Sequence, residues 1–293
     1  MRVAALWFPD WPVQALRMQE AVRVGAARGG TTRERATAIV AQHKVVVCDG
    51  LARRAGVRRG MRLRQAQAVL PELRVEELNA DRDGAAFAEI ATGLDAVASS
   101  IEVLRPGLVI VDAAAAGRFH GGEDTAVHML VDAASRAGLD ATVGVADEIA
   151  TALIAARHNG LGAVVPEGAS REFLAGQPLS VLAAEVSLGC AKEVVEQLRQ
   201  LGISNLGELA ALPARQVMTR FGQAGRRCHD IANAVPDRRV APELARPDLV
   251  VEVSYEEPLE RVDAAAFAAR QLAAQLHSVL AEAGQMCVRL RVV

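Results

Sequence analysis

Six arginines within twelve residues are the strongest candidate for a chemical role in this sequence. Between Lys44 and Arg74 there are eight basic residues and two acidic ones, whereas the whole chain has a net charge of −2. Clustered guanidinium groups favour contact with the phosphates of a nucleic acid; the alternative is a solvated face without a ligand. The arginines predicted to bind nucleic acid are Arg53, Arg54, Arg58, Arg59, Arg62 and Arg64.

Two short helices are expected to carry these arginines. The first begins near residue 51 and stops at Gly56, because glycine adopts a left-handed C-cap without a steric penalty. The second is predicted over residues 62–70 and ends before Pro71, since proline disfavours helix in the residue that precedes it.

The order of residues in this stretch resembles the fingers of Y-family (translesion) DNA polymerases. The shared features are an Ala-Arg pair at Ala52 and Arg53, then Gly-Val, Gly-Met and an alanine-rich helix that ends in Leu-Pro. In that family the arginine contacts the incoming triphosphate, so the resemblance implies this role for Arg53. A family tyrosine that also contacts the triphosphate would fall on Gly50, which has no side chain.

The same resemblance predicts where carboxylates would hold divalent metal. Nucleotidyl transfer needs acids on adjacent strand ends, because two Mg²⁺ ions contact the attacking and leaving oxygens. Aligned on a predicted strand over residues 2–8 and a hairpin over 100–112, these positions hold Trp7, Pro9, Gly107 and Leu108, none of which can bind magnesium through its side chain. We therefore predict a pseudo-polymerase that has no metal site, no cofactor and no enzymatic activity.

Two nearby acids leave an alternative open. Asp10 follows the first strand, and we interpret it as a helix N-cap rather than a displaced metal ligand. Asp112 ends the hairpin and matches a family aspartate that is not a metal ligand. The alternative hypothesis is an active translesion polymerase with a rearranged metal site that uses Asp10 and Asp112.

A second candidate for phosphate contact is a turn between helices near residue 189. Residues 187–203 resemble a helix-hairpin-helix, a motif that presents backbone N–H groups to a DNA phosphate. The usual Gly-Ile-Gly is replaced by Leu-Gly-Cys, so a purely structural turn is the alternative. The DNA contacts predicted here are Gly189, Cys190, Lys192, Arg226 and Arg227.

The composition is typical of a globular chain with two or three subdomains. Of the 293 residues 51% are hydrophobic and 3% aromatic, so small aliphatic residues must build the core. We find neither an apolar run of about 18 residues nor a signal peptide, and expect a cytoplasmic, nucleoid-associated protein without membrane contact. The four cysteines are far apart, which predicts reduced thiols without disulfides or zinc.

The pattern of elements and the resemblance together predict an α/β (α+β) chain with a right-hand polymerase-like fold. It would contain a ferredoxin-like palm, small fingers, a helical thumb with the helix-hairpin-helix, and the start of a β-α-β little finger that continues beyond Val293. The little finger is predicted as a strand over residues 250–255, a helix over 263–283 and a strand over 286–293. The expected boundaries are palm 1–24 and 81–165, fingers 25–80, thumb 166–236, linker 237–247 and incomplete little finger 248–293.

In lacking the metal-binding acids, the sequence resembles a non-catalytic bacterial branch of the family. This resemblance implies a DNA-binding adaptor in damage-induced (SOS) mutagenesis, which would bind primer–template DNA without sequence preference. It further implies binding to a sliding clamp through a region beyond residue 293, to a RecA-like accessory protein, and to an error-prone replicative-type DNA polymerase. A generic helix-hairpin-helix DNA-binding protein is a further alternative, which predicts no ferredoxin-like sheet.

Overall fold

We analysed a computed structural model of the chain, in which two compact units comprise residues 1–242 and 243–293. The structure describes residues 1–25, 35–98, 101–236, 238–241, 251–254, 261–282 and 290.

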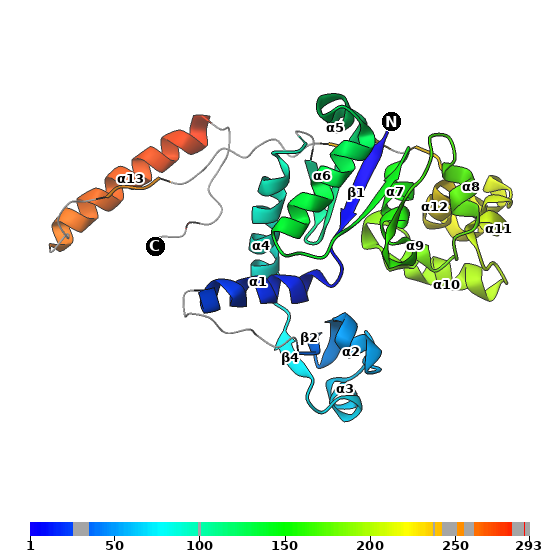
Figure 1. Cartoon of the computed structure of the whole chain (residues 1–293), viewed down its shortest axis with the longest axis horizontal. Coiled ribbons are helices and arrows are strands. Elements are labelled where there is room, and N and C mark those ends of the chain that lie inside the picture. Colours follow the sequence, from blue (N-terminus) through cyan, green and yellow to red (C-terminus); the bar gives the residue numbers. More distant parts are fainter. Residues whose placement is uncertain are drawn as a thin grey trace. The chain divides into compact units, whose positions relative to one another are not determined.

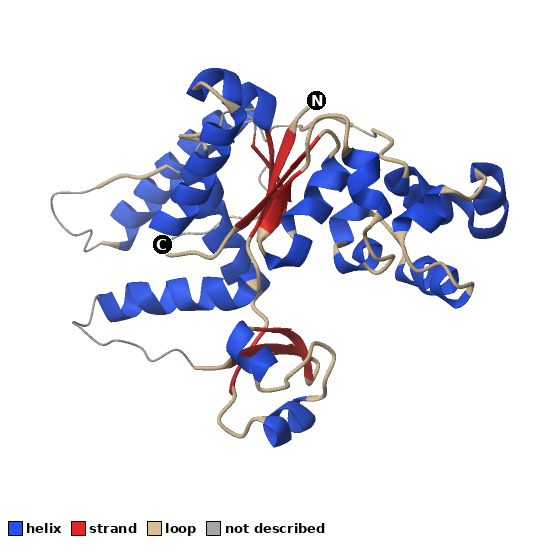
Figure 2. Cartoon of the chain, turned by 45° about the vertical axis from the view of Figure 1, so that its right-hand side comes forward, coloured by secondary structure: helices blue, strands red, loops and turns tan. Residues whose placement is uncertain are grey.

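A five-stranded sheet forms the centre of the first unit (Figures 1 and 2). Its order is β5 (Ile101–Arg105), β6 (Leu108–Asp112), β1 (Val3–Trp7), β7 (Thr142–Ala146) and β8 (Gly162–Val164). The central strand β1 pairs antiparallel with both β6 and β7. Its sequence is apolar throughout because helices cover both faces of the sheet. This sheet contradicts the alternative of a generic helix-hairpin-helix protein.

Alternate residues of β1 point into different hydrophobic cores. Leu6 packs with apolar residues of α4 (Ala80–Leu94) and α6 (Glu123–Arg136). On the other face, Val3 and Ala5 pack against α7 (Ile149–Ala156) and the helices that follow it. Two further helices of this unit are α1 (Trp11–Gly25) and α5 (Ala113–His120).

A separate three-stranded sheet carries the basic segment, which we define as residues 44–74. Its order is β3 (Lys44–Cys48), β2 (Thr37–Ala41) and β4 (Arg74–Glu77), with β4 parallel to β2. The helices α2 (Gly50–Arg54) and α3 (Leu63–Val69) each bury one alanine against this sheet. As predicted, both are short: α2 ends before Gly56, and α3 begins after Gly60 and ends before Pro71. Gly56 and Gly60 both have positive φ.

The helical segment, residues 166–236, follows the last strand. Its core is continuous with the α7 face of the large sheet, so the two are packed as one body. After the short 3-10 turn η1 (His158–Gly160), its elements are α8 (Ser170–Ala175), α9 (Val181–Ala184), η2 (Val186–Leu188), α10 (Lys192–Gln200), α11 (Leu206–Ala210) and α12 (Ala214–Ala232).

The second unit contains one described helix, α13 (Val262–Glu282), where the sequence predicts one. The strand predicted over residues 250–255 is wrong for its described part, because residues 251–254 form no strand. The strand predicted over 286–293 lies outside the described residues except for position 290. No helix within the described ranges is long and apolar enough to cross a membrane.

Candidate nucleic-acid interface

The positions that the family resemblance selects for metal ligands lie together at one end of the large sheet. Trp7, at the end of β1, pairs in register with Leu108 at the start of β6. The N–H of Phe8 donates to the carbonyl of Gly107 at 3.0 Å. Gly107 has φ +83°, and a Cβ there would lie 2.5 Å from the Cβ of Trp11, so this turn requires glycine.

The acids around this sheet end do not fit a pair of divalent ions. Across the described ranges, no three His, Cys, Asp or Glu side chains come together to form a metal site. Asp10 binds Arg53 at 2.7 Å, and Asp112 lies opposite Val3 at the far end of β6. Asp112 is four residues from Leu108 along the strand, or about 13 Å. The hypothesis that Asp10 and Asp112 together form a rearranged metal site is therefore wrong, and no metal-dependent step is assigned to them.

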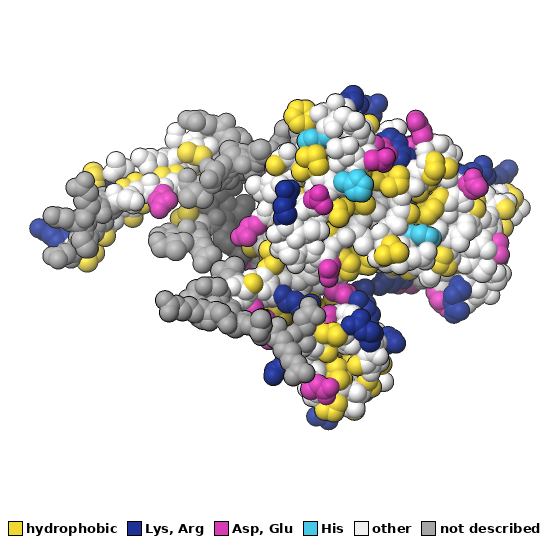
Figure 3. All heavy atoms as spheres, viewed as in Figure 1, with side chains coloured by type: hydrophobic (Ala, Val, Ile, Leu, Met, Phe, Trp, Pro, Cys, Tyr) yellow, Lys and Arg dark blue, Asp and Glu magenta, His cyan; other side chains and the backbone are white. Residues whose placement is uncertain are grey.

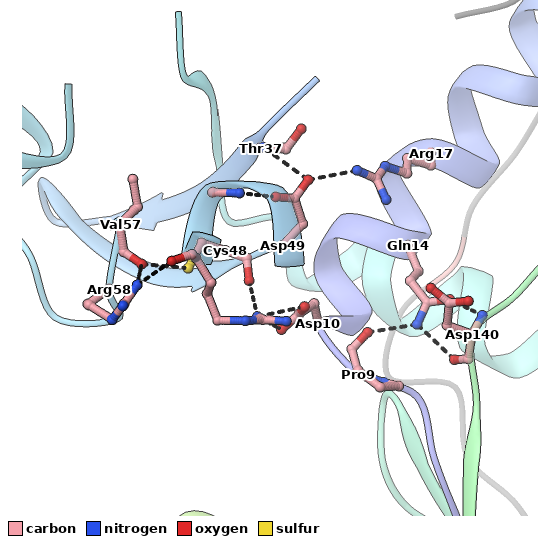
Figure 4. A network of polar contacts seen from close by, with 12 residues as sticks. Pro9, Asp10, Gln14, Arg17, Thr37, Cys48, Asp49, Val57, Arg58 and Asp140 are labelled. Atoms are coloured by element: carbon pink, nitrogen blue, oxygen red, sulfur yellow. Dashed lines mark hydrogen bonds and ion pairs between the residues drawn. The ribbon is translucent and has the colours of Figure 1, made fainter. Parts of the chain in front are cut away.

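Asp10 instead connects the large sheet to the basic segment (Figure 4). Its carboxylate accepts a hydrogen bond from Nη1 of Arg53 at 2.7 Å. Burial raises the pKa of Asp10, whereas the hydrogen bond and the charge of Arg53 lower it. Asp10 occupies the predicted N-cap position, directly before α1, and its carbonyl oxygen accepts the N–H of Val13 at 2.8 Å, while its side chain binds Arg53. Its φ of +52° is unusual for a residue with a side chain.

Asp49 forms the second connection between α1 and the basic segment. It is 5% exposed and accepts a hydrogen bond from Arg17 of α1 at 2.7 Å. It also accepts from the N–H groups of Thr37 at 3.1 Å and of Ala52 at 2.8 Å, so it caps α2 (Figure 4). Asp49 thereby fixes the helix that carries Arg53, and does so without adding a free negative charge to the surface.

The six predicted arginines of the basic segment are exposed, and only some are engaged. Besides Arg53, Arg58 donates to the carbonyl oxygen of Val57 at 3.0 Å. Figure 3 shows the dark-blue side chains gathered on this part of the surface. Four arginine side chains have no hydrogen-bond or ion-pair partner among the described residues and are free to bind an anion: Arg54, Arg59, Arg62 and Arg64.

An ion-pair cluster of Arg105, Arg157 and Glu185 lies beside Trp7. The guanidinium carbon of Arg157 lies 4.5 Å from the ring centroid of Trp7. Arg157 and Arg105 both bind Glu185, the latter through two hydrogen bonds of 2.6 and 3.0 Å. The sequence did not predict this cluster, because Glu185 and Arg105 are 80 positions apart and neither belongs to a recognisable motif.

Glu185 is held as a carboxylate although its side chain is only 2% exposed. Burial alone would raise its pKa. The hydrogen bonds from Arg105 and from the N–H of Ser187, together with the charges of both arginines, lower the pKa of Glu185 to about 2. Burial in turn lowers the pKa of Arg157. The cluster joins the large sheet to the helical segment.

A cavity of about 470 Å³ lies between the sheet end, the basic segment and the helical segment. Two cations without a described partner line it, Arg59 from the basic segment and Lys192 from the start of α10. Trp7 and Trp11 form part of its apolar wall. The cavity therefore combines apolar lining residues with the positive charges of Arg59 and Lys192, which suits a phosphate-bearing ligand.

The other residues predicted in the helical segment mainly make internal contacts. Gly189 has φ +71° and ends η2, while Arg226 binds Asp230 at 2.7 Å. Nε of Arg227 donates to the carbonyl of Leu188 at 2.8 Å. Cys190 is half-buried and packs against the core that contains Cys228. Of the five residues predicted here, Lys192 is the one that lines the cavity.

Comparison with known proteins finds one family and several relatives to which this chain is similar. Residues 22–157 match the impB/mucB/samB family. A DNA polymerase IV from Methanoculleus marisnigri is 30% identical over 199 residues, which is 67% of this chain and 54% of that relative. Protein ImuB from Caulobacter vibrioides is 28% identical over 165 residues, 56% of this chain and 35% of that protein. The chain thus spans about half the length of the first of these relatives and about a third of the second.

The fold class is confirmed by similarity to solved structures. A DinB family error prone DNA polymerase from Sulfolobus solfataricus superimposes with a TM-score of 0.63, at 20% identity. The match covers 83% of this chain and 69% of that one.

The prediction that this chain is not an enzyme is wrong on these comparisons. Several of its relatives are named DNA polymerase IV, and its fold matches that of an error-prone DNA polymerase. The prediction depended on four residues at one sheet end: Trp7, Pro9, Gly107 and Leu108. The lack of metal-binding side chains at these four positions does not exclude enzymatic activity of the whole protein.

Proposed function

We propose that this chain, whose residues 22–157 match the impB/mucB/samB family, is a Y-family polymerase-like protein that binds primer–template DNA and acts in translesion synthesis. We assign palm (1–24 and 81–165), fingers (25–80), thumb (166–236), linker (237–247) and the start of a little finger (248–293). The observation that carries the proposal is the cavity between palm, fingers and thumb, which Arg59 and Lys192 line from two sides.

The geometry supports backbone contact rather than base readout. The exposed arginines of the basic segment reach phosphates without regard to sequence. Lys192 lies across the same cavity and follows the turn at Gly189 and Cys190. Trp7 also lines the cavity, but Arg157 lies over its ring and Trp11 is 2% exposed, so the proposal depends on the cations and not on stacking.

Binding of a fluorescent primer–template duplex tests this proposal. We expect Arg59→Ala and Lys192→Ala each to weaken binding by about threefold at low salt, because each removes one phosphate contact. Arg199→Ala is the matched control, since Arg199 is exposed but paired with Glu196 on the surface of α10. Equal affinities for all three variants and the unaltered chain would contradict the assignment of this cavity.

Template-directed nucleotide addition by the chain itself is favoured by the relatives named DNA polymerase IV. The residues at the sheet end do not show how the chain would hold the divalent ions of that reaction. Primer extension with all four deoxynucleotides, in Mg²⁺ and separately in Mn²⁺, tests this activity. Extension that depends on the template would support it.

An adaptor role is a second candidate, favoured by the match to protein ImuB. In this role the chain would bring an error-prone replicative-type polymerase to primer–template DNA, and would also bind a sliding clamp and a RecA-like accessory protein. Reconstitution with these three partners tests it, because the role requires that adding this chain increases their recruitment to a primed template.

A further inference from the structure

The acidic residues that line the cavity at the sheet end are all bound to arginines. These acids are Asp10, Asp83 and Glu185. Asp10 binds Arg53 at 2.7 Å. Asp83 accepts two hydrogen bonds from Arg82, at 2.7 and 2.8 Å. Asp10 and Asp83 are thus each neutralised by one arginine and leave no free negative charge in the cavity.

Glu185 is shared by two arginines that line the same cavity. Its Oε1 accepts a hydrogen bond from Nε of Arg105 at 3.0 Å. Its Oε2 accepts from Nη2 of Arg105 at 2.6 Å and also from Arg157. One carboxylate therefore balances two guanidinium groups and leaves one positive charge over. Arg59 and Lys192 have no ion-pair partner among the described residues, so three positive charges around the cavity lack a balancing acid.

These contacts do not suit a divalent cation. Mg²⁺ prefers oxygen ligands, but every carboxylate that lines the cavity is already bound to a guanidinium. A metal ion would have to displace an arginine and would add charge where positive charge is in excess. At Trp7, where the family resemblance predicts a metal ligand, the guanidinium carbon of Arg157 lies 4.5 Å from the ring centroid. Arginine side chains therefore supply positive charge at the position of the expected metal site.

We propose that this cavity binds a chain of two or three phosphates without a divalent cation. The inference rests on the proposed function, because it concerns the same cavity, and it adds the class of ligand and its independence of metal. Arg59 and Lys192 would supply hydrogen bonds to phosphate oxygens, since neither has a partner among the described residues. Arg105 and Arg157 are engaged by Glu185 and would contribute charge rather than new hydrogen bonds.

The charges that act on Arg157 agree with an anion beside it. Burial lowers the pKa of Arg157, and the positive charges of Arg105 and Arg59 act in the same direction, whereas Glu185 raises it. Arg59 belongs to the basic segment and Arg157 follows α7, so cations from separate parts of the chain repel one another here. A phosphate chain between them would replace this repulsion by attraction.

Tryptophan fluorescence provides the test, because the chain has two tryptophans and both line this cavity. The probe is inorganic tripolyphosphate, titrated into the whole chain in EDTA and, at matched ionic strength, in excess Mg²⁺. Calorimetric titration of the same solutions detects binding that leaves the emission unchanged. We expect saturable binding in EDTA and an affinity about threefold or more weaker in Mg²⁺, since Mg²⁺ neutralises part of the phosphate charge. Binding that requires Mg²⁺, or no saturable binding in EDTA, would overturn the proposal.

Variants distinguish this cavity from general attraction of anions. Arg59→Ala and Lys192→Ala are each expected to weaken tripolyphosphate binding in EDTA by about threefold or more. Arg199→Ala is the control, because Arg199 is exposed and paired with Glu196, and its affinity should equal that of the unaltered chain. Equal losses in all three variants would overturn the proposal.

Binding of the primer–template duplex to the same samples separates this inference from the proposed function. A chain that binds the duplex but not tripolyphosphate would overturn the metal-free phosphate site alone. A chain that binds neither would overturn the proposed function as well.

Discussion

The guanidinium of Arg157 lies over the indole of Trp7, with 4.5 Å between its carbon and the ring centroid. Trp7 occupies the end of β1, where the family resemblance predicts a metal-binding carboxylate. At this sheet end the chain thus places a cation bound to an aromatic face and to Glu185. The same three side chains connect the large sheet to the helical segment.

Loss of the charge on Glu185 should destabilise the fold. Glu185→Gln keeps the size of the side chain but leaves Arg105 and Arg157 partly buried without a carboxylate. We expect the free energy of unfolding to fall by about 2–3 kcal/mol, measured by urea denaturation. Glu196→Gln is the matched control, because Glu196 forms a solvent-exposed pair with Arg199 and its loss should leave the midpoint of urea unfolding nearly unchanged. Equal effects of the two substitutions would show that the buried cluster stabilises the fold no more than an exposed ion pair does.

The same carboxylate predicts a pH dependence of stability. The pKa of Glu185 falls from 4.5 to about 2 on folding. Its contribution is therefore fully present above about pH 4.5 and is lost as the pH falls towards 2. The difference in unfolding free energy between the unaltered chain and Glu185→Gln should shrink between pH 5 and pH 3. A difference that stays constant over this range would mean that Glu185 does not carry the lowered pKa.

Release of Arg53 from Asp10 should strengthen DNA binding. Asp10→Asn removes a negative charge beside the cavity and frees a guanidinium of the basic segment. We expect affinity for primer–template DNA to rise by about threefold at low salt. Asp124→Asn, an exposed acid in the first turn of α6, gives the effect of net charge alone. An Asp10→Asn affinity no higher than that of the control would contradict a competing role for Asp10.

Two glycine substitutions should change stability in opposite directions. In β7 a Cβ on Gly144 would lie 2.3 Å from the carbonyl oxygen of Ala152, so Gly144→Ala should cost about 2 kcal/mol or more by pushing α7 off the sheet. In α4 a Cβ on Gly93 meets nothing within 4 Å, so Gly93→Ala should add about 0.5–1 kcal/mol. Thermal unfolding of both variants checks the signs. Destabilisation by both would contradict the packing described for α4.

Local patterns predicted most of the elements in the first unit. The apolar run of β1 and the Pro106-Gly107 turn of the hairpin are encoded in neighbouring residues, and the structure has both. The elements that were missed include β4, α5 and β8. Strand β4 reads Arg-Val-Glu-Glu, a charged stretch that becomes a strand only by pairing in parallel with β2. Such pairing depends on residues far apart, which a periodicity cannot reveal.

The candidate site was predictable only where a motif marked it. The arginines of the basic segment are exposed as predicted, and Lys192 lines the cavity. The acidic residues that neutralise arginines of the site lie elsewhere in the chain. Asp10 lies at the predicted N-cap position, but the sequence did not reveal that its side chain binds Arg53, and it gave no indication of a role for Glu185. Ion pairs between distant residues are set by packing, so sequence spacing does not predict them.

The salt dependence of primer–template binding tests the central claim most directly. If unpaired arginines and Lys192 hold phosphates, the affinity must fall as counterions compete for them. We predict that log K against log salt has a slope of about −3 or steeper between 50 and 300 mM salt. A slope near zero, or no binding at low salt, would contradict a nucleic-acid interface on this chain.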